Sequence, residues 1–533
     1  MAPSVQNIFL TYEHEFDTVD VVGRACWLRK VDPLAVFLAP DDMASATASR
    51  KVRAGQLRRV ARGIVTDDLD VPLEQVVARH LYELVGRLLR GAVISDRSAR
   101  KGGQPIDAAD GTRILYVTHP ERRRDLELPG HLVSVRPGPG PVEGDAAYLH
   151  DGVSVASLGR ALVDNARESH ARTGRPARTL SRYELEQWID TLASDFTDDR
   201  FARLRSQVEQ VADLLGEHDL GEVVSSLLAA AQSTRRDVKV SYPALVARRD
   251  GVPVDTRRLE LFDQLVAALR DRAPEPMSTS EAGEPRRAVL PFFEAYFSNF
   301  IEGTEFEVSE AAEIIFDAKI PQARSADAHD ILGTYQLVSD PAEMATVPGD
   351  GEQVLQLLRS RHATIMQARP DKRPGQFKTV ANRVGSRVFV APEEVIGTLQ
   401  AGWQRVRALD DPFARALTAM FLVSEVHPFD DGNGRVARVM MNAELVAAGQ
   451  VRIVIPTVYR NNYLAGLRGM SVNGRADGLI AVLAFAQRWT SQIDWSSVET
   501  AMAELEATDA LRDATDAEAE GIRLQLPARV QHA

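Results

Sequence analysis

Apolar residues recur every three or four positions on both sides of residue 430, the spacing that places side chains on one face of an α-helix. Before this point, DPFARALTAMFLVSEV is predicted to be a helix, with Asp411 as its N-cap and Pro412 at its first position. After it, RVARVMMNAELVAAG is predicted to be a second helix that ends at Gly449. A polar loop between two helices is therefore expected at residues 427–434.

Helical spacing dominates most of the chain after residue 150, as in ELEQWIDTLAS, RLRSQVEQVADLLGEH and GEVVSSLLAAAQ. The residues before it mix strand-like and helical segments. Residues 273–287 are rich in Pro, Ser, Glu and Gly, which is typical of a linker. The end of the chain, from Ala501 onward, is charged and alanine-rich and is expected to be a terminal helix that frays. We therefore predict a mainly α protein with an α+β region at 1–150, a helical region at 151–272, a linker at 273–287, a helical domain at 288–498 and a charged tail at 499–533.

Composition narrows the class of protein. The 533 residues suffice for several domains, and a net charge of −12 argues against nucleic-acid binding over the whole surface, although one basic patch is compatible with it. The single cysteine, Cys26, excludes an intramolecular disulfide and a cysteine-based zinc site. No signal peptide is evident, and the longest apolar run, from Leu479, is too short to cross a bilayer. We expect a cytoplasmic protein of bacterial type with no membrane contact; the oligomeric state stays open.

The loop and the start of the second helix read HPFDDGNGRVAR, residues 427–438. The turn Gly432-Asn433-Gly434 leads into a helix N-terminus, where unpaired N–H groups and the positive dipole end favour a phosphate. Arg435 and Arg438 lie three positions apart on one helical face and add guanidinium groups for further phosphate oxygens. The pattern therefore predicts a nucleotide site.

Two further residues of this stretch supply chemistry beside the phosphates. Asp431, directly before the turn, is placed to hold Mg²⁺ against them. His427, at the end of the preceding helix, can remove a proton from an attacking hydroxyl group.

The stretch resembles the Fic family signature HxFx(D/E)GNGRxxR at each defined position, including Phe429 as the expected buried anchor of the loop. The resemblance implies a Fic helical bundle and transfer of AMP from ATP to a Ser, Thr or Tyr hydroxyl of a target protein. It also implies that His427 is the base, that Asp431 holds the metal and that the turn with Arg435 holds the phosphates. The related Doc toxins carry lysine where this chain has Gly434, so the glycine favours nucleotidyl transfer over kinase-type chemistry.

Upstream, AVLPFFEAYFSNFIEG is predicted to be a helix over residues 288–303, with Ser298 and Glu302 four positions apart on one face. SNFIEG resembles the (S/T)xxxE(G/N) inhibitory motif of Fic proteins, in the class that carries it N-terminal to the core. The resemblance implies that Glu302 pairs with Arg438, so that Arg438 cannot hold the γ-phosphate of ATP.

Between these motifs, Thr379–Val384 and Arg387–Val390 are predicted to form two short strands about Gly385. In Fic proteins a hairpin in this position, the flap, pairs with the backbone of the target segment and directs its hydroxyl to the histidine. Such pairing is β-strand addition. Downstream, Tyr463 is expected either near the adenine, by analogy with the family, or in the core.

The N-terminal region resembles the winged-helix and adjoining fold of abortive-infection (type IV) antitoxins. The resemblance rests on the hairpin-like LRRVARGIVT and on AVISDRSA, which is predicted to be a strand followed by a cap. The basic cluster from Arg50 to Arg62 is interpreted either as a solvated surface or as a contact with DNA.

Two hypotheses remain open after this reading. The first is a Mg²⁺-dependent protein adenylyltransferase held inactive by its own helix, with another donor or the removal of AMP as variants within the enzyme class. The second is a DNA-binding, antitoxin-like regulator that uses the Fic fold as a nucleotide sensor. The presence of His427 favours the enzyme, because a sensor does not need a base.

Overall fold

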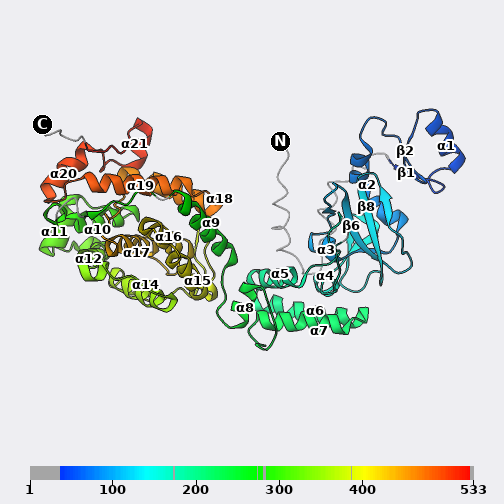
Figure 1. Ribbon diagram of the computed structural model, residues 1–533, viewed down its shortest axis with the longest axis horizontal. Helices are drawn as coiled ribbons and strands as arrows, with labels where there is room; N and C mark the ends of the chain where they lie inside the picture. Colours follow the sequence, from blue (N-terminus) through cyan, green and yellow to red (C-terminus); the bar gives the residue numbers. More distant parts are fainter. Residues whose placement is uncertain (1–35, 172–173, 273, 280–283, 386, 528–533) are drawn as a thin grey trace. The chain divides into compact units, whose positions relative to one another are not determined.

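The computed structural model describes residues 36–171, 174–272, 274–279, 284–385 and 387–527. Cys26 and the N-terminal residues in which no signal peptide was evident therefore lie outside the described residues. The chain divides into two compact units, the first made of residues 1–185 with 198–225 and the second of residues 186–197 with 226–533. Helices predominate (Figure 1), so the prediction of a mainly α protein is confirmed.

The first unit begins with a small antiparallel sheet in the order β1-β3-β2, beside helix α1 (Ser45–Arg53). The strands are β1 (Val36–Leu38), β2 (Arg58–Ala61) and β3 (Ile64–Thr66). LRRVARGIVT thus forms a hairpin, in which Arg59 is paired with Val65.

A larger sheet has the order β7-β8-β6-β4-β10-β9, and β5 also pairs with β6. Its strands are β4 (Ala92–Ile94), β5 (Ile106–Asp107), β6 (Arg113–His119), β7 (Leu126–Leu128), β8 (His131–Pro137), β9 (Ala146–Tyr148) and β10 (His150–Val155). β10 pairs with β4 in parallel, with Val153 opposite Ala92. The α+β region therefore continues past the expected boundary at residue 150, because β10 supplies an inner strand of this sheet.

Helices pack on the larger sheet and continue the chain. Val76, Val77, Leu81 and Val85 of α2 are buried in the same core as the inner strands. The other helices of the first unit are α2 (Leu73–Leu88), α3 (Asp96–Arg100), α4 (Leu158–Asn165) and α6 (Asp198–Leu215), while α5 (Arg182–Asp195) and α7 (His218–Ala231) each have residues in both units. AVISDRSA accordingly forms β4 and the start of α3, a strand followed by a short helix.

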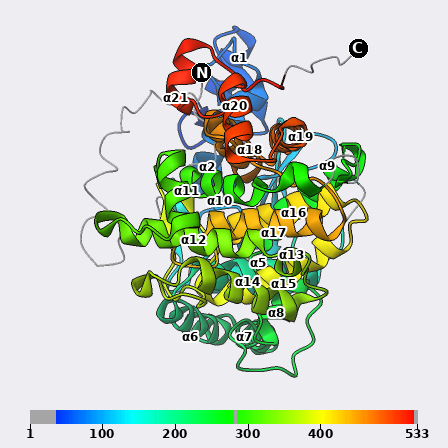
Figure 2. The same ribbon diagram turned by 90° about the vertical axis from the view of Figure 1, so that its left-hand side faces the viewer.

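The second unit is a helical bundle, and both Figure 1 and Figure 2 place α16 and α17 at its centre. Both helices are buried along most of their length, and Phe421 and Met440 are among their core residues. The helices before this pair are α8 (Pro243–Arg249), α9 (Thr256–Arg272), α10 (Leu290–Ile301), α11 (Val308–Asp317), α12 (Ser325–Ser339), α13 (Pro341–Met344), α14 (Gly351–Ile365) and α15 (Val395–Arg407). The pair and the helices after it are α16 (Pro412–Val426), α17 (Asn433–Ala447), α18 (Arg460–Asn473), α19 (Asp477–Gln492), α20 (Val498–Ala507) and α21 (Ala514–Glu520).

Helix α9 lies before the expected linker, yet it belongs to the bundle. Phe262 and Leu265 are fully buried in the same core as α15 and α16, and the Phe262 ring meets Phe421 edge-on at 5.9 Å. The two units therefore do not separate at 273–287, the main boundary expected from composition. Composition shows only that residues 273–287 are polar. A domain boundary also requires that the helices before and after the segment belong to different cores, and α9 does not meet this condition.

The segment that was expected to be a charged tail contains two helices with buried residues. Ala501 and Leu505 of α20 and Ala517 of α21 are buried in one core with Phe293 and Trp495. Small apolar residues at helical spacing are thus covered by the aromatic side chains of α10 and its surroundings, so residues 498–520 are part of the domain. Within the described part of the chain, none of the helices has the length and apolar character of a transmembrane span.

Candidate active site

The loop between α16 and α17 is held by its own side chains. Helix α16 begins with the side chain of Asp411 accepting from Ala414 N and ends at His427, which has a left-handed φ of 53°. The Asn433 side chain closes the loop, since its Oδ1 accepts from Phe429 N and its Nδ2 donates to Phe429 O, both at 2.8 Å. These two hydrogen bonds to one residue fix the path of the chain between His427 and helix α17.

Gly432 allows the chain to enter α17. Its φ is +73°, and a Cβ built on it would lie 2.8 Å from Met366 Sδ. A larger residue would therefore be strained by both the backbone and the packing.

Phe429 is fully buried, as expected of an anchor, and its ring stacks on His362 with 3.8 Å between the centroids. His362 Nδ1 accepts from Gly375 N at 2.9 Å, so its Nε2–H donates to Asp431 O at 3.1 Å. Burial lowers the pKa of His362 to about 4, which keeps the ring neutral. His362 therefore positions the loop and is not free to ligate a metal.

His427 has the geometry of a general base. Its Nδ1 lies 3.3 Å from Ser424 O and donates to it, so Nε2 carries the lone pair. The ring stacks on Phe389 with 3.9 Å between the centroids. Burial, with the charges of Lys378 and Arg387, lowers the pKa of His427 to about 4, so the ring is neutral near pH 7 and able to accept a proton.

Arg438 is bound by the helix that was predicted to inhibit the site. Its Nε donates to Ser298 Oγ at 3.0 Å, and its NH2 donates to Ser298 O and to Glu302 Oε1, both at 2.7 Å. Arg438 is only 5% exposed. Although burial acts to lower the pKa of Arg438, the Glu302 carboxylate holds this pKa above its ordinary value, so the guanidinium stays charged.

The Glu302 carboxylate also lies against the first turn of α17. A Cβ built on Gly434 would be 2.1 Å from Glu302 Oε1, so only glycine leaves room for the carboxylate there. Glu302 follows the last residue of α10, and Gly303 continues the chain with a φ of +90°. An anion of this protein thus stands where the sequence analysis expected a phosphate.

Arg435 is bound elsewhere. Its NH1 donates to Asp330 Oδ2 of α12 at 2.5 Å, and Arg369 Nε donates to the same oxygen at 2.8 Å. Both Arg435 and Asp330 are buried. In this structure its guanidinium fixes α17 to α12, and the expected contact of Arg435 with phosphates stays a prediction.

Asp431 faces outward. Its side chain is 44% exposed, its Oδ1 accepts from Gly432 N at 2.6 Å, and Arg435 NH2 is 3.9 Å away. Among the described residues there is no group of three or more His, Cys, Asp or Glu side chains that could hold a metal ion. An exposed single carboxylate fits a magnesium ion only if substrate phosphates supply other ligands.

The expected flap is a short hairpin of β11 (Arg383–Val384) and β12 (Arg387–Val388), which is shorter than the strands predicted from sequence. Val380, Val384 and Val388 are exposed on it. Asn382 joins it to the catalytic loop, since its Nδ2 donates to Phe429 O at 2.9 Å.

Lys378 strengthens the same connection. Its N donates to Pro428 O at 2.8 Å, and its buried Nζ donates to Asn382 Oδ1 at 2.7 Å. Burial lowers the pKa of Lys378 to about 8.

Sequence reasoning missed Asp330, His362, Lys378 and Asn382, since none belongs to the motif. No local pattern marks them, because each is defined by a partner distant in the chain. Tyr463 is buried, 1% exposed, with its hydroxyl 3.3 Å from Met420 Sδ, and its place near an adenine stays a prediction.

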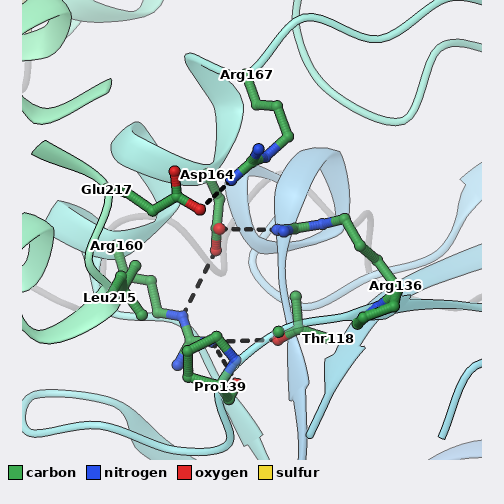
Figure 3. Close-up of a pocket in the computed structure, with 10 residues that line it drawn as sticks. Thr118, Arg136, Pro139, Arg160, Asp164, Arg167, Leu215 and Glu217 are labelled. Carbon is green, nitrogen blue, oxygen red and sulfur yellow. Dashed lines mark hydrogen bonds and ion pairs between the residues drawn. The ribbon is translucent and has the colours of Figure 1, made fainter. Parts of the chain in front are cut away.

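A separate cavity of about 260 Å³ in the first unit is lined by charged side chains (Figure 3). Arg136 NH2 donates to Asp164 Oδ1 at 2.8 Å, Arg160 NH1 donates to Asp145 Oδ2 at 2.5 Å, and Arg167 is paired with Glu217. The polar atoms here that lack a hydrogen bond have almost no exposed surface. The charges thus balance one another, and the arrangement favours a structural role.

Comparison with protein families matches residues 354–445 to the family described as Fic/DOC. The resemblance predicted from HPFDDGNGRVAR is therefore confirmed. Among curated proteins, the chain is 36% identical over 98 residues to protein adenylyltransferase fic-1 of Caenorhabditis briggsae, covering 17% of this chain and 19% of that protein. It is 23% identical over 263 residues to protein adenylyltransferase Fic of Nematostella vectensis, covering 48% of this chain and 60% of that protein.

The chain thus spans less than two thirds of the length of either relative. Both relatives are eukaryotic, so a bacterial type stays a prediction. Among solved structures, Fic-1 residues 134–508 from Caenorhabditis elegans shows 16% identity and a TM-score of 0.35, covering 61% of this chain and 99% of that one. A Fic domain containing signaling protein from Bacteroides thetaiotaomicron shows 18% identity and a TM-score of 0.34, covering 46% and 97%. The antitoxin resemblance of the N-terminal region stays a prediction.

The lowered pKa of His427 predicts the pH at which its ring becomes protonated. Because burial depresses the pKa, the stability that the neutral ring contributes is fully present above about pH 6.5 and is lost as the pH falls through about 4. In ¹³C-histidine NMR, the signal that disappears in His427→Gln should have its midpoint near pH 4. A midpoint at pH 6.5 or above would contradict this description of the site.

Proposed function

We propose, from the membership of residues 354–445 in the Fic/DOC family, that the protein transfers AMP from ATP to a hydroxyl side chain of a target protein. The observation that carries the proposal is the placing of a neutral histidine, with Nε2 free, at one end of a loop whose other end opens α17. A base and a helix N-terminus at the two ends of one fixed loop provide for a nucleophile and a phosphate together.

The proposed step follows from these positions. His427 Nε2 takes the proton of the target hydroxyl as its oxygen attacks the α-phosphorus of ATP. The new oxygen–phosphorus bond replaces the bond to the β-phosphate oxygen, and pyrophosphate leaves. The N–H groups of the first turn of α17 and Arg438, once released from Glu302, bind the phosphate oxygens.

Magnesium is the metal we propose, as a companion of ATP. Asp431 would hold it through an exposed carboxylate, with phosphate oxygens as further ligands. The metal would neutralise charge on the leaving pyrophosphate. A cytoplasmic location, expected from the sequence, is part of the same proposal.

We further propose that Glu302 holds the enzyme inactive. Its carboxylate is bonded to Arg438 and lies against Gly434, so it competes with the γ-phosphate for the same cation and the same helix end. ATP could then bind only with its α-phosphate turned from the line of attack, and a misplacement of about 1 Å can cost about 10²-fold in rate.

Replacement of His427 tests the transfer. His427→Ala should lose roughly 10²–10⁴-fold of the label transferred from α-labelled ATP to lysate proteins, because only the base is removed. The His427→Ala variant should still bind ATP. In the protein that retains His427, chelation of Mg²⁺ by EDTA should abolish transfer. The assay is best run in the Glu302→Gly background, with mass spectrometry to locate AMP on its acceptor. Undiminished labelling by His427→Ala would remove the histidine from the mechanism.

Replacement of Glu302 tests the inhibition. Glu302→Gly should label targets much faster than the parent, because Arg438 is free to form a charge-assisted fork with the phosphate. The double variant Glu302→Gly with Arg438→Ala should lose this gain. Glu305→Gly, the same change at an exposed glutamate three positions on, is the matched control and should leave the rate unaltered. Equal activity of Glu302→Gly and its parent at every ATP concentration would leave α10 a purely structural helix.

DNA binding by the first unit is a second candidate function, and one observation favours it. Helix α1 and the hairpin β2–β3 carry five exposed basic residues: Arg50, Lys51, Arg53, Arg59 and Arg62. A short helix beside a basic hairpin resembles a reading helix with its wing. Arg58 differs, since its NH1 donates to Leu69 O and Val71 O, both at 2.8 Å.

The whole protein should therefore shift duplex DNA at low salt, and binding should weaken steeply as salt is added. Arg59→Ala with Arg62→Ala should lower the slope of log K against log salt by up to about 2, at about 0.9 per lost phosphate contact. The matched double variant Arg200→Ala with Arg203→Ala, on α6, should keep the slope. No shift at micromolar protein would exclude this second function.

A further inference from the structure

The end of α16 and the start of the catalytic loop are held by two residues of another segment. An α-helix leaves the C=O groups of its last turn without partners inside the helix. Here the four successive carbonyls from Val426 to Phe429 accept hydrogen bonds from Lys378 and Asn382. Both residues belong to the segment that leads into β11, so they are distant in sequence from the loop that they bind.

Lys378 binds two of these four carbonyls. Its backbone N donates to Pro428 O at 2.8 Å, and its Nζ donates to Val426 O at 3.3 Å. Lys378 is only 3% exposed, so its ammonium group has lost its water and depends on these partners. A positive charge at the C-terminal end of a helix is favoured by the helix dipole. Lys378 therefore acts as a cap of α16.

Asn382 binds the other two carbonyls and is itself oriented by the lysine. Its Nδ2 donates to His427 O at 3.4 Å and to Phe429 O at 2.9 Å. Its Oδ1 accepts from Lys378 Nζ at 2.7 Å. Because the ammonium group binds the amide oxygen, the amide nitrogen is turned to the loop. One buried charge thus holds the end of α16 directly and the loop through Asn382.

His427 needs this support because of its backbone conformation. Its φ of 53° and ψ of 59° lie in the left-handed region, which residues other than glycine seldom adopt. Such a conformation persists only where the surroundings impose it. The two peptide planes that define these angles carry Val426 O and His427 O, and these oxygens accept from Lys378 and Asn382. From this backbone the ring of His427 stacks on Phe389.

The ammonium group of Lys378 also bears on the protonation of His427. Burial is the largest cause of the lowered pKa of His427, and the positive charges of Lys378 and Arg387 lower this pKa further, whereas the Glu302 carboxylate raises it. The other charged groups that face the lysine are those of Arg258 on α9 and Asp430 in the loop. The lysine therefore favours the neutral ring that a general base requires.

We infer that Lys378 is a positioning residue for His427: its buried ammonium group, through Val426 O and Asn382, holds the base in the left-handed conformation from which it meets the target hydroxyl. This inference rests on the proposed function and specifies it, because it names a residue outside 427–438 on which the base depends. Lys378 acts through the backbone of the loop and through its charge, and not on the substrates.

Removal of the charge tests the inference by kinetics. Lys378→Met keeps the length of the side chain and removes its charge. In the Glu302→Gly background, with α-labelled ATP and lysate proteins, it should lower the maximal rate of label transfer by about 10-fold or more, because the base loses its alignment. The ATP concentration that gives half of the maximal rate should be unaltered, and Lys378→Arg, which restores the charge, should recover most of the rate.

Lys319→Met, the same change at a 59% exposed lysine of the second unit, is the matched control and should leave the rate unaltered. A maximal rate in Lys378→Met equal to that of the parent would overturn the inference. A loss that Lys378→Arg does not recover, or one that arises from weaker binding of ATP, would also overturn it.

Titration of His427 by ¹³C-histidine NMR tests the inference without catalysis. In Lys378→Met the midpoint of His427 should rise from near pH 4 by about 1 pH unit, because a positive charge beside the ring opposes its protonation. A purely structural lysine would not shift this midpoint, so an unchanged midpoint would overturn the inference. If Glu302→Gly labels nothing, the proposed function fails, and the titration still decides whether Lys378 acts on His427.

Asn382→Ala tests the same contact where Lys378→Met does not fold. The position is only half-buried, and the lysine charge is kept. This variant should lower the maximal rate of transfer in the Glu302→Gly background while the midpoint of His427 stays near pH 4. An unaltered rate in Asn382→Ala would show that the loop does not depend on this pair of residues and would contradict the inference.

Discussion

The buried charge of Arg438 is the constraint around which the site is arranged. A guanidinium that is 5% exposed has lost its water and needs an anion beside it. In this structure the anion is Glu302, whose Oε1 accepts from Arg438 NH2 at 2.7 Å. The same position at the first turn of α17 suits a phosphate. Under the proposed function, a single cation therefore has two alternative partners, and the presence of one excludes the other.

This exchange requires that the surroundings of Arg438 stay in place when Glu302 leaves. Asn433 holds the catalytic loop through Phe429, and Arg435 fixes α17 to α12 through Asp330. Those contacts are buried, whereas the Glu302 side chain is 32% exposed and stands at the end of its helix before Gly303. The contact with the least support is thus the one that we propose closes the site. A regulatory contact of this kind can break without disturbing the base or the phosphate cradle.

Local features of the site could be predicted from the sequence, and distant ones could not. The loop at 427–432 and its two helices follow from apolar spacing, from Asp411 and from glycine, all within a few residues of each other. The pairing of Glu302 with Arg438 spans 136 residues and was reached only through a family resemblance. The pairing of Arg435 with Asp330 could not be predicted, because nothing in the sequence marks Asp330 as its buried partner. Helix α9 and residues 498–520 were assigned to the wrong side of a boundary for a similar reason, since polar composition conceals a buried face.

The role of α9 shows why a matched domain does not by itself define the active site of a longer chain. Residues 354–445 contain His427, the turn at Gly432 and the hairpin of β11 and β12, yet Arg258 of α9 donates to Val388 O of that hairpin at 2.7 Å. The carboxylate that binds Arg438 also comes from outside that segment. Under the proposed function, the residues that act in transfer lie within the matched segment, while helices that precede it contact both the hairpin and Arg438. A change in either flanking helix can therefore alter these contacts with no change in the loop that carries His427.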